Sequence, residues 1–173
     1  MFGKMITDLK FKYYEFITRN DVPVSKSEWV LDWDRLIHLD AEKLAEGGMK
    51  EAYDGLLPTL EKYVKEPLVL TEVQFENSDN YVVEFNCRRW TIYDEDTQSS
   101  GEAWVNAAVA FFEIVNSQLT SSDWTFYAFY GSNDFSGMFL TQQEFEMSRE
   151  KLPKKSDWPY LPTHEGEYNG RPY

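Results

Sequence analysis

The chain has 173 residues, of which 17 are Lys or Arg and 30 are Asp or Glu, so its formal net charge at pH 7 is −13. This length suits a single domain with its own hydrophobic core, and the aromatic content of 17% is too high for a disordered acidic chain. The acidity argues against direct binding of DNA or RNA, because phosphate backbones are bound by clustered Lys and Arg side chains.

The cysteine, histidine and apolar residues give expectations about compartment and cofactors. Cys87 is the only cysteine, so no disulfide can form within the chain, and we expect a reducing, cytoplasmic compartment. The spacing around His38 and His164 fits no zinc site built from His and Cys, and we expect neither a metal nor another cofactor. No run of about 18 apolar residues is present, so no membrane span is predicted.

The N-terminal part of the chain has helical periodicity. Apolar residues over 2–19 recur with the 3.6-residue period of an amphipathic helix. Residues 25–37 open with a capping box and continue at helical spacing, which predicts a second, short helix. A third helical pattern covers 40–64, but Gly47-Gly48 lies inside it, so the pattern leaves open one long helix or two shorter helices with a break at the glycines.

After Pro67 the apolar period changes from 3.6 to 2, as in β-strands. Residues 68–75 and 81–93 are rich in β-branched and aromatic residues, and a turn-forming run, 77–80, lies between them. This pattern predicts an antiparallel hairpin. Alternation within 81–93 places Cys87 on the face toward the core, where a cysteine is a small apolar filler and not a nucleophile.

The clearest helical pattern of the chain covers 101–119, whose broad apolar face suits a helix that lies across a sheet. A second hairpin is predicted after it, with strands at 124–130 and 138–140 joined by the loop 131–137. A capping box then opens a short final helix at Thr141.

Together these elements predict an α+β fold in one domain, residues 1–152. An antiparallel sheet of about four strands, formed by the two hairpins, packs with the helix between them and with the N-terminal helices. Residues 153–173 are rich in proline and show no helix or strand period, so we expect an irregular tail that lies over the domain. The strand order stays open.

The strand at 124–130 supplies the first part of a candidate binding surface. Alternation places Tyr127 and Phe129 on the face away from the helix at 101–119, where they are either exposed or covered by another helix. Exposed aromatic residues bordered by acids are typical of protein-binding surfaces.

The loop 131–137 supplies the second part, because it is longer than a tight hairpin needs and holds Asn133, Asp134 and Phe135 between two glycines. Phe135 either projects from the tip as an apolar anchor or folds back onto the sheet.

Acidic residues supply the third part, and Asp94, Glu95 and Asp96 are the densest run among them. A calcium loop starting at Asp94 requires Gly and Glu where this chain has Ser99 and Val105, so we expect a solvated loop and no metal site. We predict that an acidic cluster steers a basic partner. Its members are Glu72, Glu76, Asp79, Glu84, Asp94, Glu95, Asp96 and Glu102.

No catalytic residues are predicted, because the chain has no serine-hydrolase elbow, no dinucleotide fingerprint and no phosphate-binding loop. We therefore expect a non-enzymatic protein that binds a basic protein partner. In size, acidity and aromatic content the chain is similar to the small acidic immunity proteins that neutralise bacterial toxins. Two alternatives stay open: a hydrolase or carbohydrate-handling protein that uses a carboxylate pair, and a homodimeric regulatory or scaffold subunit.

Overall fold

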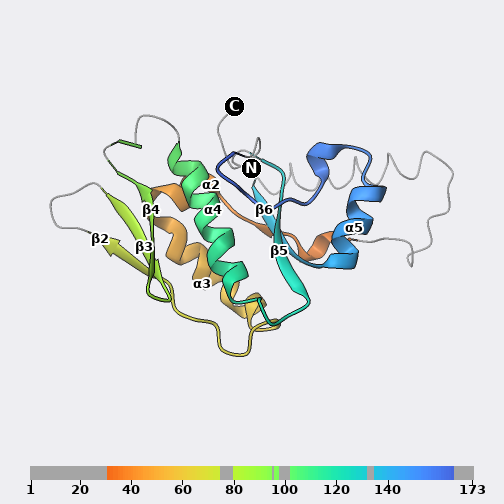
Figure 1. Ribbon diagram of the computed structural model, residues 1–173, viewed down its shortest axis with the longest axis horizontal. Coiled ribbons are helices and arrows are strands. Elements are labelled where there is room, and N and C mark those ends of the chain that lie inside the picture. Colours follow the sequence, from red (N-terminus) through yellow and green to blue (C-terminus); the bar gives the residue numbers. More distant parts are fainter. Residues whose placement is uncertain (1–30, 75–79, 95, 98–101, 132–134, 166–173) are drawn as a thin grey trace. The chain divides into compact units, whose positions relative to one another are not determined.

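The computed structural model describes residues 31–74, 80–94, 96–97, 102–131 and 135–165. All of them except Leu31 belong to one compact unit, which is shown in Figure 1. The predicted helix over 2–19 and the first part of the one over 25–37 lie outside the described residues.

The fold of the described part is α+β, as predicted, but its strands form two antiparallel three-stranded sheets in place of a single four-stranded one. One sheet has the order β1-β6-β5 and the other β2-β3-β4 (Figure 1). The strands are β1 (Ile37–His38), β2 (Thr71–Gln74), β3 (Tyr81–Phe85), β4 (Arg88–Tyr93), β5 (Trp124–Phe129) and β6 (Ser136–Thr141). The helices are α2 (Ala41–Lys43), α3 (Met49–Leu60), α4 (Glu102–Ser117) and α5 (Gln142–Lys151).

The predicted strand over 81–93 is in fact two strands, β3 and β4, joined by a two-residue turn. Asn86 has a φ of 49° and Cys87 a φ of 62°, and two successive positive φ angles are the signature of a type I′ turn. The second position of such a turn usually holds glycine. Because Cys87 stands there in this chain, the sequence pattern predicts one continuous strand and no turn. Cys87 is exposed at the turn, and the prediction that it faces the core is wrong.

The predicted short helix over 25–37 does not continue to its end. Trp33–Arg35 form only a 3-10 turn, and the backbone is extended again at Leu36. Ile37 and His38 pair with Gly137 and Ser136 as strand β1. Tertiary pairing with β6 therefore overrides the helical spacing of the apolar residues in this segment.

The helical pattern after Asp40 is broken at the two glycines, so of the two arrangements left open by the sequence the broken one is found. Asp40 caps α2 by accepting a hydrogen bond from the Lys43 backbone N–H at 3.0 Å. Gly47 then takes a φ of 94°, in the left-handed region that favours glycine, and ends the turn Leu44–Gly48. The chain restarts as α3 at Met49.

The start of α3 is capped by side chains from the sheet β2-β3-β4, because Gly48 offers no side chain of its own. The Met49 backbone N–H donates to the Tyr81 hydroxyl at 3.2 Å, and the Lys50 backbone N–H donates to Glu72 Oε1 at 2.8 Å. The Tyr81 hydroxyl donates to the same carboxylate at 2.7 Å. Burial and this carboxylate raise the pKa of Tyr81 far above its ordinary value, so the phenol stays protonated.

Helix α4 lies between the two sheets, as Figure 1 shows, and contacts both β4 and β5. Two asparagines on it fix these contacts. The Asn106 amide donates to the Ile92 carbonyl in β4 at 3.1 Å, while the Asn116 side chain bonds to both backbone groups of Phe126 in β5. The helix predicted over 101–119 is thus confirmed, with a hydrogen-bonding role for its asparagines in addition to its apolar face.

The outer edge of β5 is closed at two points. Asn116 pairs with the backbone of Phe126, and Tyr160 pairs with the backbone of Ala128 through hydrogen bonds of 2.8 and 3.0 Å. An edge strand whose N–H and C=O groups already have partners is a poor template for pairing with another chain.

Candidate functional site

The aromatic surface predicted on β5 is covered in the structure. Tyr127 is 7% exposed and stacks on Phe145 of α5, with ring centroids 4.5 Å apart. Phe129 is 0% exposed and meets the edge of Trp33 at 5.6 Å. Phe126 faces the opposite way and stacks on Phe112 of α4 at 4.7 Å. Both faces of the strand are therefore buried, and the side chains of Tyr127 and Phe129 lie in the interior.

Phe135 does not project from the loop either. It is 0% exposed, its ring lies 5.3 Å from that of Phe112, and its carbonyl accepts a hydrogen bond from the Leu39 backbone N–H at 2.8 Å. Folding back onto the core is the second of the two arrangements left open by the sequence. Asn133 and Asp134 lie outside the described residues.

The predicted acidic cluster does not form one surface in the part of it that the structure describes. Glu72 and Glu84 sit at neighbouring pairs of the β2–β3 register, so they point to opposite faces of the sheet. Glu72 caps α3, and Glu84 forms an ion pair with Arg89.

The other described members of that cluster come after β4, in the turn at Asp94 and at the start of α4. Asp94 accepts hydrogen bonds from the backbone N–H groups of Asp96 and Thr97, so it stabilises its own turn. Asp96 and Glu102 are exposed. Glu76, Asp79 and Glu95 lie outside the described residues.

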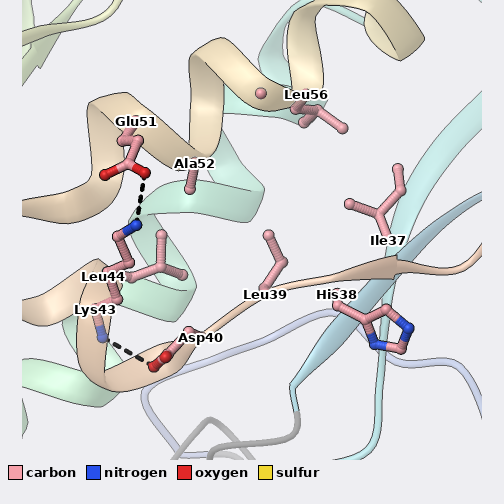
Figure 2. Close-up of a pocket in the computed structure, with 10 residues that line it drawn as sticks. Ile37, His38, Leu39, Asp40, Lys43, Leu44, Glu51, Ala52 and Leu56 are labelled. Carbon is pink, nitrogen blue, oxygen red and sulfur yellow. Dashed lines mark hydrogen bonds and ion pairs between the residues drawn. The ribbon is translucent and has the colours of Figure 1, made fainter. Parts of the chain in front are cut away.

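A different site is found between the segment that contains β1 and the helices α2 and α3. A hollow of about 360 Å³ opens there, at the small end of the size range of ligand pockets. Ile37, Leu39, Leu44, Ala52 and Leu56 give it an apolar floor (Figure 2). Gly55 also lines it, and a Cβ added at Gly55 would meet nothing within 4 Å.

Charged side chains gather at one end of this hollow, as Figure 2 shows. The Lys43 ammonium lies 2.7 Å from Glu51 Oε1, and the two side chains are 51% and 74% exposed. Asp40, the cap of α2, lies beside them. His38 is exposed at the other end, with its Nδ1 3.4 Å from the Ser136 hydroxyl.

The break at the glycines brings this charged end together. Lys43 and Glu51 are eight residues apart, which in a straight helix is a rise of about 12 Å. The kink at Gly47 interrupts that rise. A Cβ on Gly48 would lie 2.5 Å from Lys43 Cγ and 2.7 Å from the Lys43 carbonyl oxygen, so only glycine lets the Lys43 stem cross here toward Glu51.

The carboxylates of the hollow already have hydrogen-bond donors. Asp40 and Glu51 are both exposed, and each is already bound to a donor on Lys43. Among the described residues, no three His, Cys, Asp or Glu side chains lie close enough together to hold a metal ion.

Comparison with family models, with curated proteins and with solved structures finds no match to this chain. Within the described part of the chain, no helix is long and apolar enough to cross a bilayer.

A second hollow, of about 450 Å³, lies near the start of α5 and offers no apolar floor. It is lined by hydroxyl, amide and carboxylate side chains only, those of Ser122, Asp123, Thr125, Thr141, Gln142 and Gln143. The first hollow combines an apolar floor with charged groups, which is the usual composition of a binding site.

Sequence reasoning missed the residues of the first hollow. Asp40 was expected only as a helix cap, and nothing in the pattern joined Ile37 or Leu39 to α3. One signal was present: Gly55 stands in the middle of a helical pattern, where glycine is unfavourable and calls for a reason.

Proposed function

We propose that this protein is not an enzyme and that it binds a basic protein partner through an acidic surface on α2, α3 and the turn between them. One observation carries the proposal. Residues 40–54 contain five acids against two lysines, and all five acids are exposed. We call this stretch the acidic segment; its acids are Asp40, Glu42, Glu46, Glu51 and Asp54.

The two lysines of the acidic segment offset only two of its five carboxylates. Lys43 pairs with Glu51 at 2.7 Å, and Lys50 pairs with Asp54 at 2.5 Å. The surface that remains is dominated by carboxylates, and the net charge of −13 adds to it at longer range. Such a surface accelerates the encounter with a cationic protein, and the acceleration falls steeply with salt.

An immunity-type role, in which the acidic segment covers a basic surface of a toxin, is the form of this function that we put forward. Two observations favour this form over the two alternatives. The two carboxylates of the hollow are exposed, unlike the partly buried pair that a hydrolase uses. A homodimer could form through the aromatic residues of β5 if they were exposed, but Tyr127 is covered by Phe145 of α5 and Phe129 is buried.

We also propose that the protein is located in the cytoplasm. Cys87 is an exposed, free thiol, and such a thiol is preserved in a reducing compartment and oxidised or cross-linked outside it. Labelling of intact and permeabilised source cells with a thiol reagent tests this placement, because a cytoplasmic Cys87 reacts only after permeabilisation.

The test of the function is co-purification from source cells with the full chain as bait, at about 0.05 M and about 0.5 M NaCl. A basic protein is expected at low salt and is expected to be lost at high salt. With that partner purified, changing Glu42 and Glu46 to Gln and Asp54 to Asn should lower the association rate about tenfold.

The matched control removes three exposed acids outside the acidic segment, by Asp123→Asn, Glu150→Gln and Glu165→Gln. This control leaves the association rate nearly unchanged if the acidic segment is the binding surface. An equal loss in both triple variants, or failure to recover any basic protein at low salt, would contradict the proposal.

A further inference from the structure

We infer that the hollow beside α3 receives a Lys or Arg side chain of the partner, and that Lys43 holds the position of the incoming cation in the free protein. This inference rests on the proposed function, because it names the chemistry by which the acidic segment would recognise a basic protein.

Gly55 is the first observation. It lies in the interior of α3, where glycine lowers helix stability relative to alanine. Nothing in the packing forbids a larger residue, since a Cβ at this position meets no atom within 4 Å. A residue that breaks a local rule without a structural reason is expected at functional sites. Gly55 lines the hollow together with Ala52 and Ile37, and it adds no side chain to that lining.

The composition of the hollow selects the occupant. Its floor is apolar, and its charged end holds two carboxylates: Asp40, which accepts a hydrogen bond from the Lys43 backbone N–H, and Glu51, which binds the Lys43 ammonium. An anionic side chain would be repelled there, and an aliphatic side chain would bury the floor while removing water from the carboxylates. Lys and Arg have an aliphatic stem that suits the floor and a cationic head that suits the carboxylates.

Lys43 shows that the charged end accepts such a head. Its ammonium binds Glu51, and its stem crosses Gly48 at a distance that no other residue at position 48 would allow. Both members of this pair are more than half exposed, and exposed ion pairs contribute little free energy. A partner's cation can therefore replace Lys43 on Glu51 at small cost, and Lys43 then turns out into solvent.

The test uses a short capped peptide with a single arginine flanked by glycines, titrated into the full-length protein and followed by backbone amide chemical shifts. We expect shifts in residues 37–56, and no such shifts with the same peptide carrying citrulline, the neutral isostere of arginine. Glu51→Gln should weaken binding about fivefold or more. Gly55→Leu should abolish it by filling the hollow, with the melting temperature checked to show that the variant is folded.

Lys43→Met is the sharpest variant, because it removes the resident cation and keeps a stem of similar length. It should tighten binding of the arginine peptide about threefold. The matched control is Lys50→Met, which removes the same charge from a pair outside the hollow. Equal affinities for Lys43→Met and Lys50→Met, or equal binding of the arginine and citrulline peptides, would overturn the inference.

The two proposals fail separately. If a basic partner binds Gly55→Leu as tightly as it binds the unmodified protein, the hollow is not its anchor, while the acidic segment still is its docking surface. If the arginine peptide binds the hollow but no basic protein is ever recovered, the site stands and the proposed partner class is wrong.

Discussion

Cys87 sits in a left-handed backbone conformation that a side chain with a Cβ adopts only at a cost of about 1–2 kcal/mol. Cys87→Gly removes this cost, although glycine also adds entropy to the unfolded chain. We expect a net gain of about 0.5–1 kcal/mol in the free energy of unfolding, measured by urea denaturation followed through tryptophan fluorescence.

Cys87→Ala is the control for this prediction, since it removes the thiol and keeps the Cβ. Its stability should match that of the unmodified protein. If alanine and glycine give the same gain, the thiol and not the backbone conformation is the source of the effect.

Glu144 ties the turn at Trp33–Arg35 to the start of α5. It accepts a hydrogen bond from the Arg35 guanidinium at 2.7 Å and forms the capping box of α5 with Thr141. Burial raises the pKa of Glu144, but the hydrogen bonds from Arg35 and from the Thr141 backbone outweigh it, so the pKa lies below its ordinary value. The folded state thus favours the charged carboxylate.

This shift makes stability depend on pH in a defined direction. The contribution of Glu144 is fully present above its ordinary pKa of 4.5 and is lost as the pH falls through the lower pKa of the folded state. Glu144→Gln should lower the free energy of unfolding by about 1–3 kcal/mol at pH 7. The difference from the unmodified protein should shrink on acidification below pH 4.5.

Glu146→Gln is the comparison for this experiment, because Glu146 is exposed on the same helix. It should change the free energy of unfolding by less than about 0.5 kcal/mol. A constant difference between Glu144→Gln and the unmodified protein across the acid range would show that the ion pair is not the cause.

Helix α3 and the turn before it offer a matched pair of glycine substitutions, at Gly55 and Gly47. Gly55→Ala places a methyl group in open space and should raise the free energy of unfolding by about 1 kcal/mol. Gly47→Ala should lower it by about 1–2 kcal/mol, because the φ of 94° at this position suits only glycine. Thermal melts followed by circular dichroism measure both, and equal effects of the two changes would contradict the explanation.

The elements with strong local signals could be predicted from the sequence. The apolar face of α4 and the capping box at Thr141 depend on residues close together in the chain, and the break at Gly47 is one of the two arrangements that the sequence left open. The turn between β3 and β4 escaped prediction because Asn86-Cys87 lacks the usual glycine. The strand β1 escaped because two residues carry no period, and only the pairing with β6 makes them a strand.

The candidate site was less predictable than the fold, for a related reason. Whether Tyr127 is exposed depends on whether α5 lies on that face of β5, and no local pattern reports this. The hollow likewise joins Leu39 to Ala52 through tertiary packing. The number of acidic residues is known from the sequence. Which of them lie together on the folded surface depends on tertiary packing and could not be predicted.

For the molecule as a whole, the net charge of −13 predicts a dependence of stability on salt. Repulsion among the carboxylates opposes the folded state, and added ions screen it. The melting temperature at pH 7 should therefore rise as NaCl increases from about 0.01 M to about 0.3 M. Near pH 4.5, the isoelectric point, the same salt series should leave it almost unchanged. A rise of equal size at both pH values would assign the effect to ion-specific hydration.

The cap on α3 couples the opening of this helix to the opening of the sheet β2-β3-β4. The amides of Met49 and Lys50 are held by Tyr81 and Glu72 in the sheet, and not by the helix they begin. Helix ends normally fray, and their amide protons exchange with solvent quickly. Here the first amides of α3 should exchange only when β2 and β3 separate, so in native-state hydrogen exchange they should follow the sheet. The helix and the sheet would then open as a single cooperative unit.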